Sequence, residues 1–119
     1  MRKSEVSRLK RHRRLKLKMY GTGEKPRLVV HRSLKHLCAQ VLDDSRRATL
    51  FSLSTLDKEI RQKFPNAGNL KAAQYFGEVF AKKAKEKGFA KIIFDRAGYL
   101  YHGRIRVFAE ALRKGGLEF

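Results

Sequence analysis

Seven of the eleven residues in the segment 8–18 are Lys or Arg, and this run limits which parts of the chain can form a core. In a helix, which turns about 100° per residue, these cations would lie on every side. Because no apolar face remains, we expect the segment to be disordered or frayed by itself and to become ordered against phosphates. Glycines at 21 and 23 then interrupt any helix. The sequence predicts a basic N-terminal extension over residues 1–20 and a single globular domain over residues 21–119.

The charge of the chain indicates its partner. Among 119 residues, 29 are Lys or Arg and 11 are Asp or Glu, and the resulting net charge of +18 exceeds what solubility requires. Nucleic acid and an anionic membrane surface are the two candidate polyanions. A membrane span needs about 20 consecutive apolar residues, and the apolar runs here, such as residues 92–94, are far shorter. We therefore expect a nucleic-acid partner and no membrane.

Other features of the composition indicate the compartment. Residues 1–5 are basic, but no apolar segment typical of a secretory signal follows them. The single cysteine, Cys38, allows no intrachain disulfide, which fits a reducing cytosol. Hydrophobic residues make up 42% of the chain and include eight Phe and four Tyr, enough for one small core. The sequence predicts a folded cytoplasmic protein.

Three short β-like runs follow the extension. Residues 27–32, 36–43 and 48–55 are each rich in Val, Leu, Thr or Phe, and short polar segments connect them. Connections of this length join neighbouring antiparallel strands. The pattern therefore predicts a three-strand antiparallel meander.

The second half of the domain alternates helices with one further strand. A short helix is expected between Thr55 and Phe64, and a long one between the N-cap Asn69 and Gly88. The apolar face of the long helix is spaced at three and four residues and consists of Ala73, Phe76, Gly77, Phe80, Ala81 and Ala84.

A buried strand and a last helix complete the predicted fold. The apolar run in residues 91–95 is typical of a strand that is buried on both faces. A helix over residues 104–114 would turn Ile105, Phe108, Ala109 and Leu112 inward. The predicted fold class is α/β, with a mixed β-sheet made of the meander plus a crossover strand and packed by helices.

The first strand carries cations on both faces. By strand alternation, Arg27 and His31 share one face and Arg32 lies on the other. If helices cover only one side of the sheet, cations on the open side could contact a nucleic-acid backbone. Solvated edge residues are an equal alternative, because the sequence does not distinguish a phosphate contact from solvation.

The loop at residues 97–104 groups side chains suited to RNA. Its glycines permit close approach of a backbone, and its tyrosines and histidine can stack on unpaired bases or hydrogen-bond to them. Arg104 can reach a phosphate. For Tyr99 and Tyr101 an alternative is open, in which each ring covers the core.

Metal and catalytic sites are not expected. The four histidines lack Cys or carboxylate neighbours at zinc-ligand spacing, and no nucleotide-binding glycine-rich loop is present. Acids at the ends of strands and helices could hold Mg²⁺ in a nuclease, but they are ordinary turn and capping residues too. These acids are Asp43, Asp44, Asp57 and Asp95. We favour the turn and capping roles.

Two sets of motifs resemble one known family. The first set is KPRLVVHRS at 25–33, KH at 35–36, AQV at 39–41 and STLDKE at 54–59. The second set is FDRAGY at 94–99, YHGR at 101–104 and GLEF at 116–119. In this order they resemble the bacterial large-subunit ribosomal proteins that bind 5S rRNA, and the resemblance extends over essentially the whole chain.

The resemblance implies a function and a set of partners. It implies a basic extension lying on RNA, an α/β domain docked on 5S rRNA, and a bridge from 5S to 23S rRNA in the central protuberance, beside neighbouring large-subunit proteins. It implies no catalytic activity, no cofactor and no small-molecule substrate. A chromatin-type DNA-binding protein is the main alternative in another functional class, because its charge would be similar.

The residues predicted to contact RNA combine the extension, the first two strands and the loop. They are Arg2, Lys3, Arg8, Lys10, Arg11, Arg13, Arg14, Lys16, Lys18, Arg27, His31, Arg32, Ser33, Lys35, His36, Gln40, Arg96, Tyr99, Tyr101, His102, Gly103, Arg104 and Arg106.

Overall fold

Two amphipathic helices supply half of the buried hydrophobic residues in the computed structural model, which describes residues 3–16 and 19–119. They are α3 (Leu70–Glu86) and α4 (Gly103–Lys114). Every residue of the two predicted apolar faces is buried, so both predictions are confirmed. Rings of Phe76 and Phe108 stack 5.1 Å apart between the helices. A Cβ on Gly77 would come within 2.9 Å of the Phe108 carbonyl oxygen, so this glycine lets the helices pack closely.

The sheet has the predicted mixed topology. Its strands are β1 (Arg27–Arg32), β2 (Leu37–Asp43), β3 (Ala48–Ser54) and β4 (Ile93–Asp95), in the order β3-β2-β1-β4. The first three are antiparallel, and β4 pairs parallel to β1. Because α2 (Lys58–Lys63) and α3 lie between β3 and β4 in the chain, they form the crossover. The α/β fold class is confirmed.

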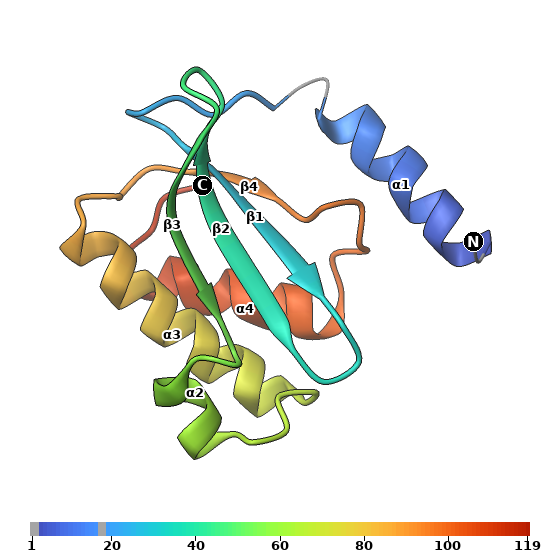
Figure 1. The fold of residues 1–119 in the computed structure, drawn as a ribbon, viewed down its shortest axis with the longest axis vertical. Helices are drawn as coiled ribbons and strands as arrows, with labels where there is room; N and C mark the ends of the chain where they lie inside the picture. The colour runs from blue at the N-terminus through green and yellow to red at the C-terminus, as the bar shows by residue number, and fades with distance from the viewer. Residues whose placement is uncertain (1–2, 17–18) are drawn as a thin grey trace.

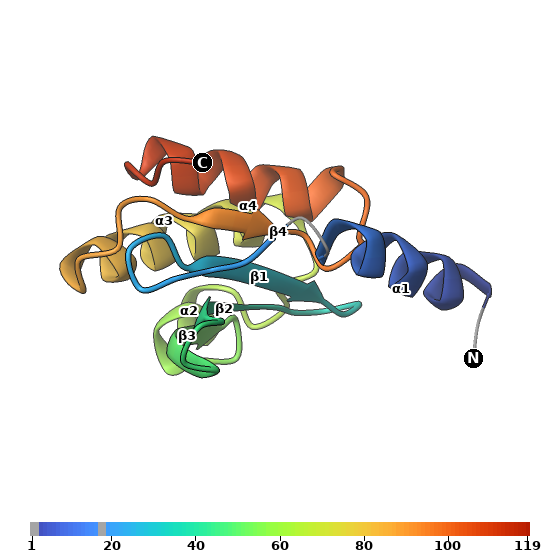
Figure 2. The same cartoon turned by 90° about the horizontal axis from the view of Figure 1, so that it is seen from above.

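The helices α3 and α4 cover one face of this twisted sheet (Figures 1 and 2). Leu28 and Val30 of β1, and Leu37, Ala39 and Val41 of β2, point into the core on that side. The other face of β2 carries Cys38 and Gln40, which are half-buried. The helices are therefore concentrated on one side, as the sequence analysis assumed.

Local signals set the ends of α3. The side chain of Asn69 accepts a hydrogen bond from the backbone N–H of Ala72 at 2.8 Å, as an N-cap should. Gly88 follows the helix with φ of +89°, the left-handed conformation that glycine adopts without strain. The strand predicted at 91–95 is shorter than expected, because Lys91 and Ile92 turn to the C-terminal segment, where Ile92 N–H bonds to the Glu118 carbonyl. Ile93 and Phe94 are half-buried, so the prediction of burial on both faces is wrong for them.

The N-terminal segment is helical in the structure. Helix α1 (Lys3–Lys16) extends from one side of the domain, near the ends of β1 and β4 (Figures 1 and 2). The sequence predicted disorder or fraying for this segment by itself, because it has no apolar face. In the structure the segment is a helix docked on the domain through polar contacts, which need no apolar face, and its state by itself stays a prediction. No helix formed by the described residues is long and apolar enough to cross a membrane.

Candidate RNA interface

Arg27 is held inside the domain by two carboxylates. Its side chain is 6% exposed. Nη1 donates to Asp95 Oδ2 at 2.6 Å, and Nε and Nη2 donate to the two oxygens of Asp44 at 3.0 Å each. The hydrogen bonds to Asp44 raise the pKa of Arg27 most, against the effect of burial, and Asp95 adds to the rise. Although Arg27 was predicted to contact RNA, its donors are used within the protein.

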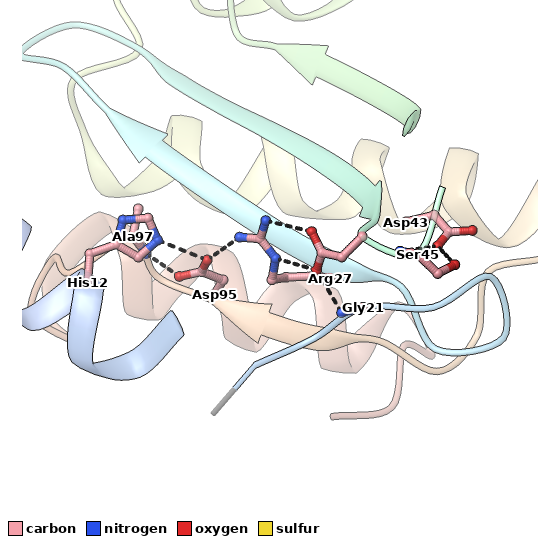
Figure 3. Close-up of polar contacts among 8 residues, drawn as sticks. His12, Gly21, Arg27, Asp43, Ser45, Asp95 and Ala97 are labelled. Atoms are coloured by element: carbon pink, nitrogen blue, oxygen red, sulfur yellow. Dashed lines mark hydrogen bonds and ion pairs between the residues drawn. The ribbon is translucent and has the colours of Figure 1, made fainter. Parts of the chain in front are cut away.

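The same carboxylates connect three further segments (Figure 3). Asp95 Oδ1 accepts the backbone N–H of Ala97 at 2.8 Å, and its Oδ2 lies 3.1 Å from His12 Nε2. Asp44 Oδ2 accepts the N–H of Gly21 at 2.7 Å. The capping role predicted for Asp95 is confirmed by its bond to Ala97. Sequence analysis missed the larger role, which is to position α1 and the segment that follows it relative to the sheet.

One face of α1 docks on the loop after β4. Arg8 Nη1 donates to the Ala97 carbonyl at 2.7 Å, and Arg11 Nε donates to the Gly98 carbonyl at 2.8 Å. With His12 these residues stand at i, i+3 and i+4, so they share a side of the helix. Gly98 has φ of +79°, and a Cβ there would overlap the carbonyl oxygen of Arg8. Gly98 therefore lets the loop after β4 approach α1 closely.

The remaining described cations of α1 point away from the domain. Lys10, Arg13 and Arg14 are exposed, on the side opposite Arg8 and His12. The predicted contacts Arg2 and Lys18 lie outside the described residues, and the side chains of Lys3 and Lys16 are outside the description too. Docking thus divides the basic run into cations that hold the helix in place and cations that remain open to a partner.

Two arginines lie over the ring of Tyr99, and a third, Arg104, bonds to the carbonyl of Ser33 next to Arg32. We call Arg8, Arg32, Tyr99 and Arg104 the Tyr99 cluster. The guanidinium carbons of Arg8 and Arg32 lie over the Tyr99 ring, 4.6 and 5.1 Å from its centroid. The Tyr99 hydroxyl donates to the Arg32 carbonyl at 3.2 Å. Such contacts hold cations over the negative face of an aromatic ring. The ring of Tyr99 therefore supports arginines, whereas Tyr101 is 43% exposed.

Arg104 completes the cluster with an unused donor. Its Nη2 donates to the Ser33 carbonyl at 2.7 Å, while its Nη1 is buried without a hydrogen-bond partner among the described residues. Burial, and then the charge of Arg32, lowers the pKa of Arg104. Within the described part of the chain, none of the three arginines forms an ion pair with a carboxylate. The cluster therefore carries positive charge that no carboxylate of the described residues neutralises.

The turn between β1 and β2 lies beside this cluster. His31, Arg32, Ser33 and Lys35 are all exposed. Partial burial of the ring, followed by the charge of Arg8 and the neighbouring His12, lowers the pKa of His31. The turn thus presents polar and cationic groups next to the Tyr99 cluster.

Other predicted contacts are bound within the protein in different ways. His36 Nδ1 lies 3.0 Å from Thr55 Oγ1, and Gln40 is half-buried on the open face of the sheet. Arg96 Nη1 donates to the Tyr99 carbonyl at 2.6 Å. Arg106 pairs with Glu110 at 3.0 Å on the exposed surface of α4.

The N-terminus of α4 has no side-chain cap. His102 stands at the N-cap of α4, is exposed and makes no capping bond through its side chain, and Gly103 follows with φ of +57°. The predicted loop is therefore partly structural, through Tyr99 and Arg96, and partly exposed, through Tyr101 and His102.

The acids considered for a nuclease have structural partners. Asp43 accepts hydrogen bonds from Ser45, which lower its pKa, and Asp57 accepts the N–H of Ser54 at 2.9 Å. Asp44 and Asp95 bind Arg27. No three His, Cys, Asp or Glu side chains in the described part of the chain are grouped so that they could hold a metal ion.

A small α/β domain with arginines grouped on an aromatic ring, beside a helix with an open cationic side, has the features of a basic nucleic-acid-binding protein. Comparison with known proteins identifies the family to which the chain belongs. The model of the ribosomal L18 family of archaea, bacteria, mitochondria and chloroplasts matches residues 2–119. The chain belongs to this family.

Bacterial relatives agree with the family model. The chain is 54% identical over 110 residues to the large ribosomal subunit protein uL18 of Pelotomaculum thermopropionicum, and this match covers 92% of the chain and 90% of the relative. It is 49% identical over 112 residues to the protein of that name in Caldicellulosiruptor saccharolyticus, covering 94% and 90%. The chain is accordingly a structural component of the large ribosomal subunit in the cytoplasm, with ribosomal RNA and ribosomal proteins as partners. This is a family of structural proteins and not of enzymes, which agrees with the prediction.

Proposed function

We propose that this protein binds 5S rRNA and helps to attach it to 23S rRNA in the central protuberance, beside neighbouring large-subunit proteins. The motifs at residues 25–59 and 94–119 support this function through their resemblance to 5S-binding proteins. In this proposal the extension, residues 1–20, contributes phosphate contacts, and the domain, residues 21–119, contributes the choice of RNA.

The Tyr99 cluster is the observation that carries the proposal. Like charges repel, so Arg8 and Arg32 on one ring, with Arg104 bonded to the neighbouring Ser33 carbonyl, favour an anion at this place. Phosphate oxygens match both the charge and the fork geometry of arginine. The Nη1 of Arg104 is buried without a partner among the described residues, so the charge of this guanidinium is not compensated inside the domain.

The proposed contact surface therefore groups residues around this cluster and along the open side of α1. Arg27 is omitted because its donors are taken by Asp44 and Asp95. The residues are Arg8, Lys10, Arg13, Arg14, His31, Arg32, Ser33, Lys35, Gln40, Tyr101, His102 and Arg104.

Selectivity tests the proposed function. We expect the protein to bind 5S rRNA more tightly than transfer RNA or random duplex DNA at about 0.15 M salt, where nonspecific phosphate binding is weakened. Filter binding or fluorescence anisotropy with the three nucleic acids measures this. Equal affinity for 5S rRNA and duplex DNA would contradict the proposal and favour a general nucleic-acid-binding protein.

A variant links selectivity to the cluster. Arg32→Gln removes one cation of the cluster and should weaken 5S binding about tenfold, the effect of losing a hydrogen bond to a charged group. Arg61→Gln, on the exposed side of α2, removes the same charge away from the cluster and is the matched control. Equal losses in both variants would show that total charge matters and the cluster does not.

A second prediction concerns pH and His31. The groups acting on this imidazole are Arg8, His12 and Arg27, which together with burial lower its pKa, and Asp95, which raises it. A phosphate placed beside it would favour the protonated form. Binding should then take up a proton, so the affinity should rise as pH falls below the ordinary histidine pKa of about 6.5.

Replacement of the imidazole measures this linkage. His31→Gln should reduce the pH dependence of the dissociation constant for 5S rRNA by up to about tenfold per pH unit between pH 7.5 and 5.5. His36→Gln is the control for general histidine titration, because His36 lies against Thr55 and is outside the proposed contact surface. Thermal melts are needed at each pH, because a lowered folded-state pKa removes stability as pH falls through the unfolded-state pKa. An unchanged pH dependence in His31→Gln would refute a phosphate beside His31.

A further inference from the structure

A basic pocket lies against β4, which is an edge strand of the sheet. Its volume is about 540 Å³. The walls combine three cations, Lys25, Arg96 and Arg113, with aromatic side chains of Phe94, Tyr101 and Phe119. Among the described residues that line it there is no Asp or Glu. Sequence analysis did not select Lys25, Arg113, Phe94 or Phe119, because they come from four separate parts of the chain.

The aromatic groups of this pocket form an ordered stack. The rings of Phe94 and Phe119 are 5.2 Å apart and inclined by only 17°. The guanidinium of Arg113 lies over the Phe119 ring, 4.4 Å from its centroid. A hydrogen bond of 3.3 Å from Arg113 Nη2 to the Phe119 carbonyl helps to hold it there. The stack therefore carries a planar, exposed cation as one of its members.

An unpaired nucleotide matches these groups. Bases released from a helix stack on arginine planes and on tyrosine rings, whereas bases inside a duplex have both faces covered. Arg113 and Tyr101 provide such surfaces, and Lys25 and Arg96 can bind the attached phosphates. The volume lies within the range of about 300–1,000 Å³ that is usual for small-ligand sites.

The pocket also adjoins the proposed RNA interface. Arg96, in its wall, donates to the carbonyl of Tyr99, the centre of the cluster described above. A strand of RNA bound at the Tyr99 cluster could thus continue to the edge of β4. This continuity, and the stacking surfaces of Arg113 and Tyr101, favour RNA over an acidic protein segment.

We propose that this pocket binds one unstacked nucleotide of ribosomal RNA, with its base against Arg113 and Tyr101 and its phosphate near Lys25 and Arg96. The assignment rests on the proposed function, because it takes RNA as the partner. It adds a site that recognises a base outside a helix, in addition to the phosphate contacts of the Tyr99 cluster and α1.

Fluorescence of a base analogue tests the site with the full-length protein. The probe is a single-stranded oligoribonucleotide of about six nucleotides with one 2-aminopurine, whose emission is quenched by stacking. Arg113→Ala should abolish the quenching and weaken binding about tenfold, the effect of losing one stacking partner. Arg113→Lys keeps the charge without the plane, so it should restore part of the affinity and little of the quenching. Lys114→Ala, the exposed neighbour outside this pocket, is the matched control and should change neither.

The other outcomes each overturn the proposal. They are an unquenched probe at saturation, equal weakening by Arg113→Ala and Lys114→Ala, and full quenching with Arg113→Lys. The proposal is also overturned if, in NMR titrations, an oligoglutamate peptide shifts the amide signal of Phe119 and the oligonucleotide does not. Thermal melts show whether each variant folds. If Arg113→Ala does not fold, the quenching measured with Arg113→Lys tests the proposal. Parallel titration with 5S rRNA separates the nucleotide pocket from the proposed 5S function. If the pocket binds no nucleotide, Arg32→Gln should still weaken 5S binding.

Discussion

Replacing Arg27 by leucine is expected to lower the free energy of unfolding by about 3–5 kcal/mol, the usual cost of removing one partner of a buried ion pair. The change leaves the carboxylate of Asp95, which has no exposed surface, without its closest cation. It also removes the two hydrogen bonds that Asp44 accepts from the guanidinium. Urea denaturation followed by circular dichroism measures the loss.

Arg46→Leu is the matched control for this prediction. Arg46 also pairs with an acid, Asp43, but its side chain is 76% exposed, and exposed pairs contribute only about 0–1 kcal/mol. The double variant Arg27→Leu with Asp95→Leu should recover part of the stability, because it removes the uncompensated charge. Recovery should be incomplete, since Asp95 also holds Ala97 and His12. A loss in Arg27→Leu no larger than that in Arg46→Leu would mean that the buried network does not stabilise the fold.

Neutralising the open side of α1 should have the largest effect on RNA binding. The variant Lys10→Gln, Arg13→Gln, Arg14→Gln should flatten the slope of log K against log salt by about two to three units, since each phosphate contact contributes about 0.7–0.9. Affinity for 5S rRNA should fall steeply at low salt. Preference for 5S over a control RNA should largely persist, because phosphate contacts position a protein without reading sequence.

The design depends on how α1 is docked. Deleting residues 1–18 would also remove Arg8, Arg11 and His12, so a truncated protein would lose contacts with the domain together with its charge. The triple variant changes only exposed side chains, and its melting temperature should stay that of the parent protein. Its control replaces Arg61, Lys71 and Lys82, which are exposed on α2 and α3, by glutamine. An unchanged salt slope in the first variant, or an equal change in the control, would show that α1 does not lie on phosphates.

Much of the fold could be predicted from local sequence pattern. Spacing at three and four residues identified the buried faces of α3 and α4, and Asn69 and Gly88 marked the ends of α3. These predictions succeeded because burial along one helix depends on residues that are neighbours in the chain. The net charge indicated a polyanion for the same kind of reason, since it needs no knowledge of which side chains meet.

Only the tertiary structure decided which cations are available to a partner. Arg27 and Arg32 belong to one strand, and their side chains give no local sign that the first is buried between carboxylates and the second lies over Tyr99. The partner Asp95 is 68 residues from Arg27, and the carbonyl bound by Arg8 is 89 residues away. An arginine is stable in the interior only when carboxylates from other segments reach it. The sequence by itself thus determined the main helices and strands of the domain and the total charge. The parallel pairing of β1 with β4 and the docking of α1 determined where that charge can act.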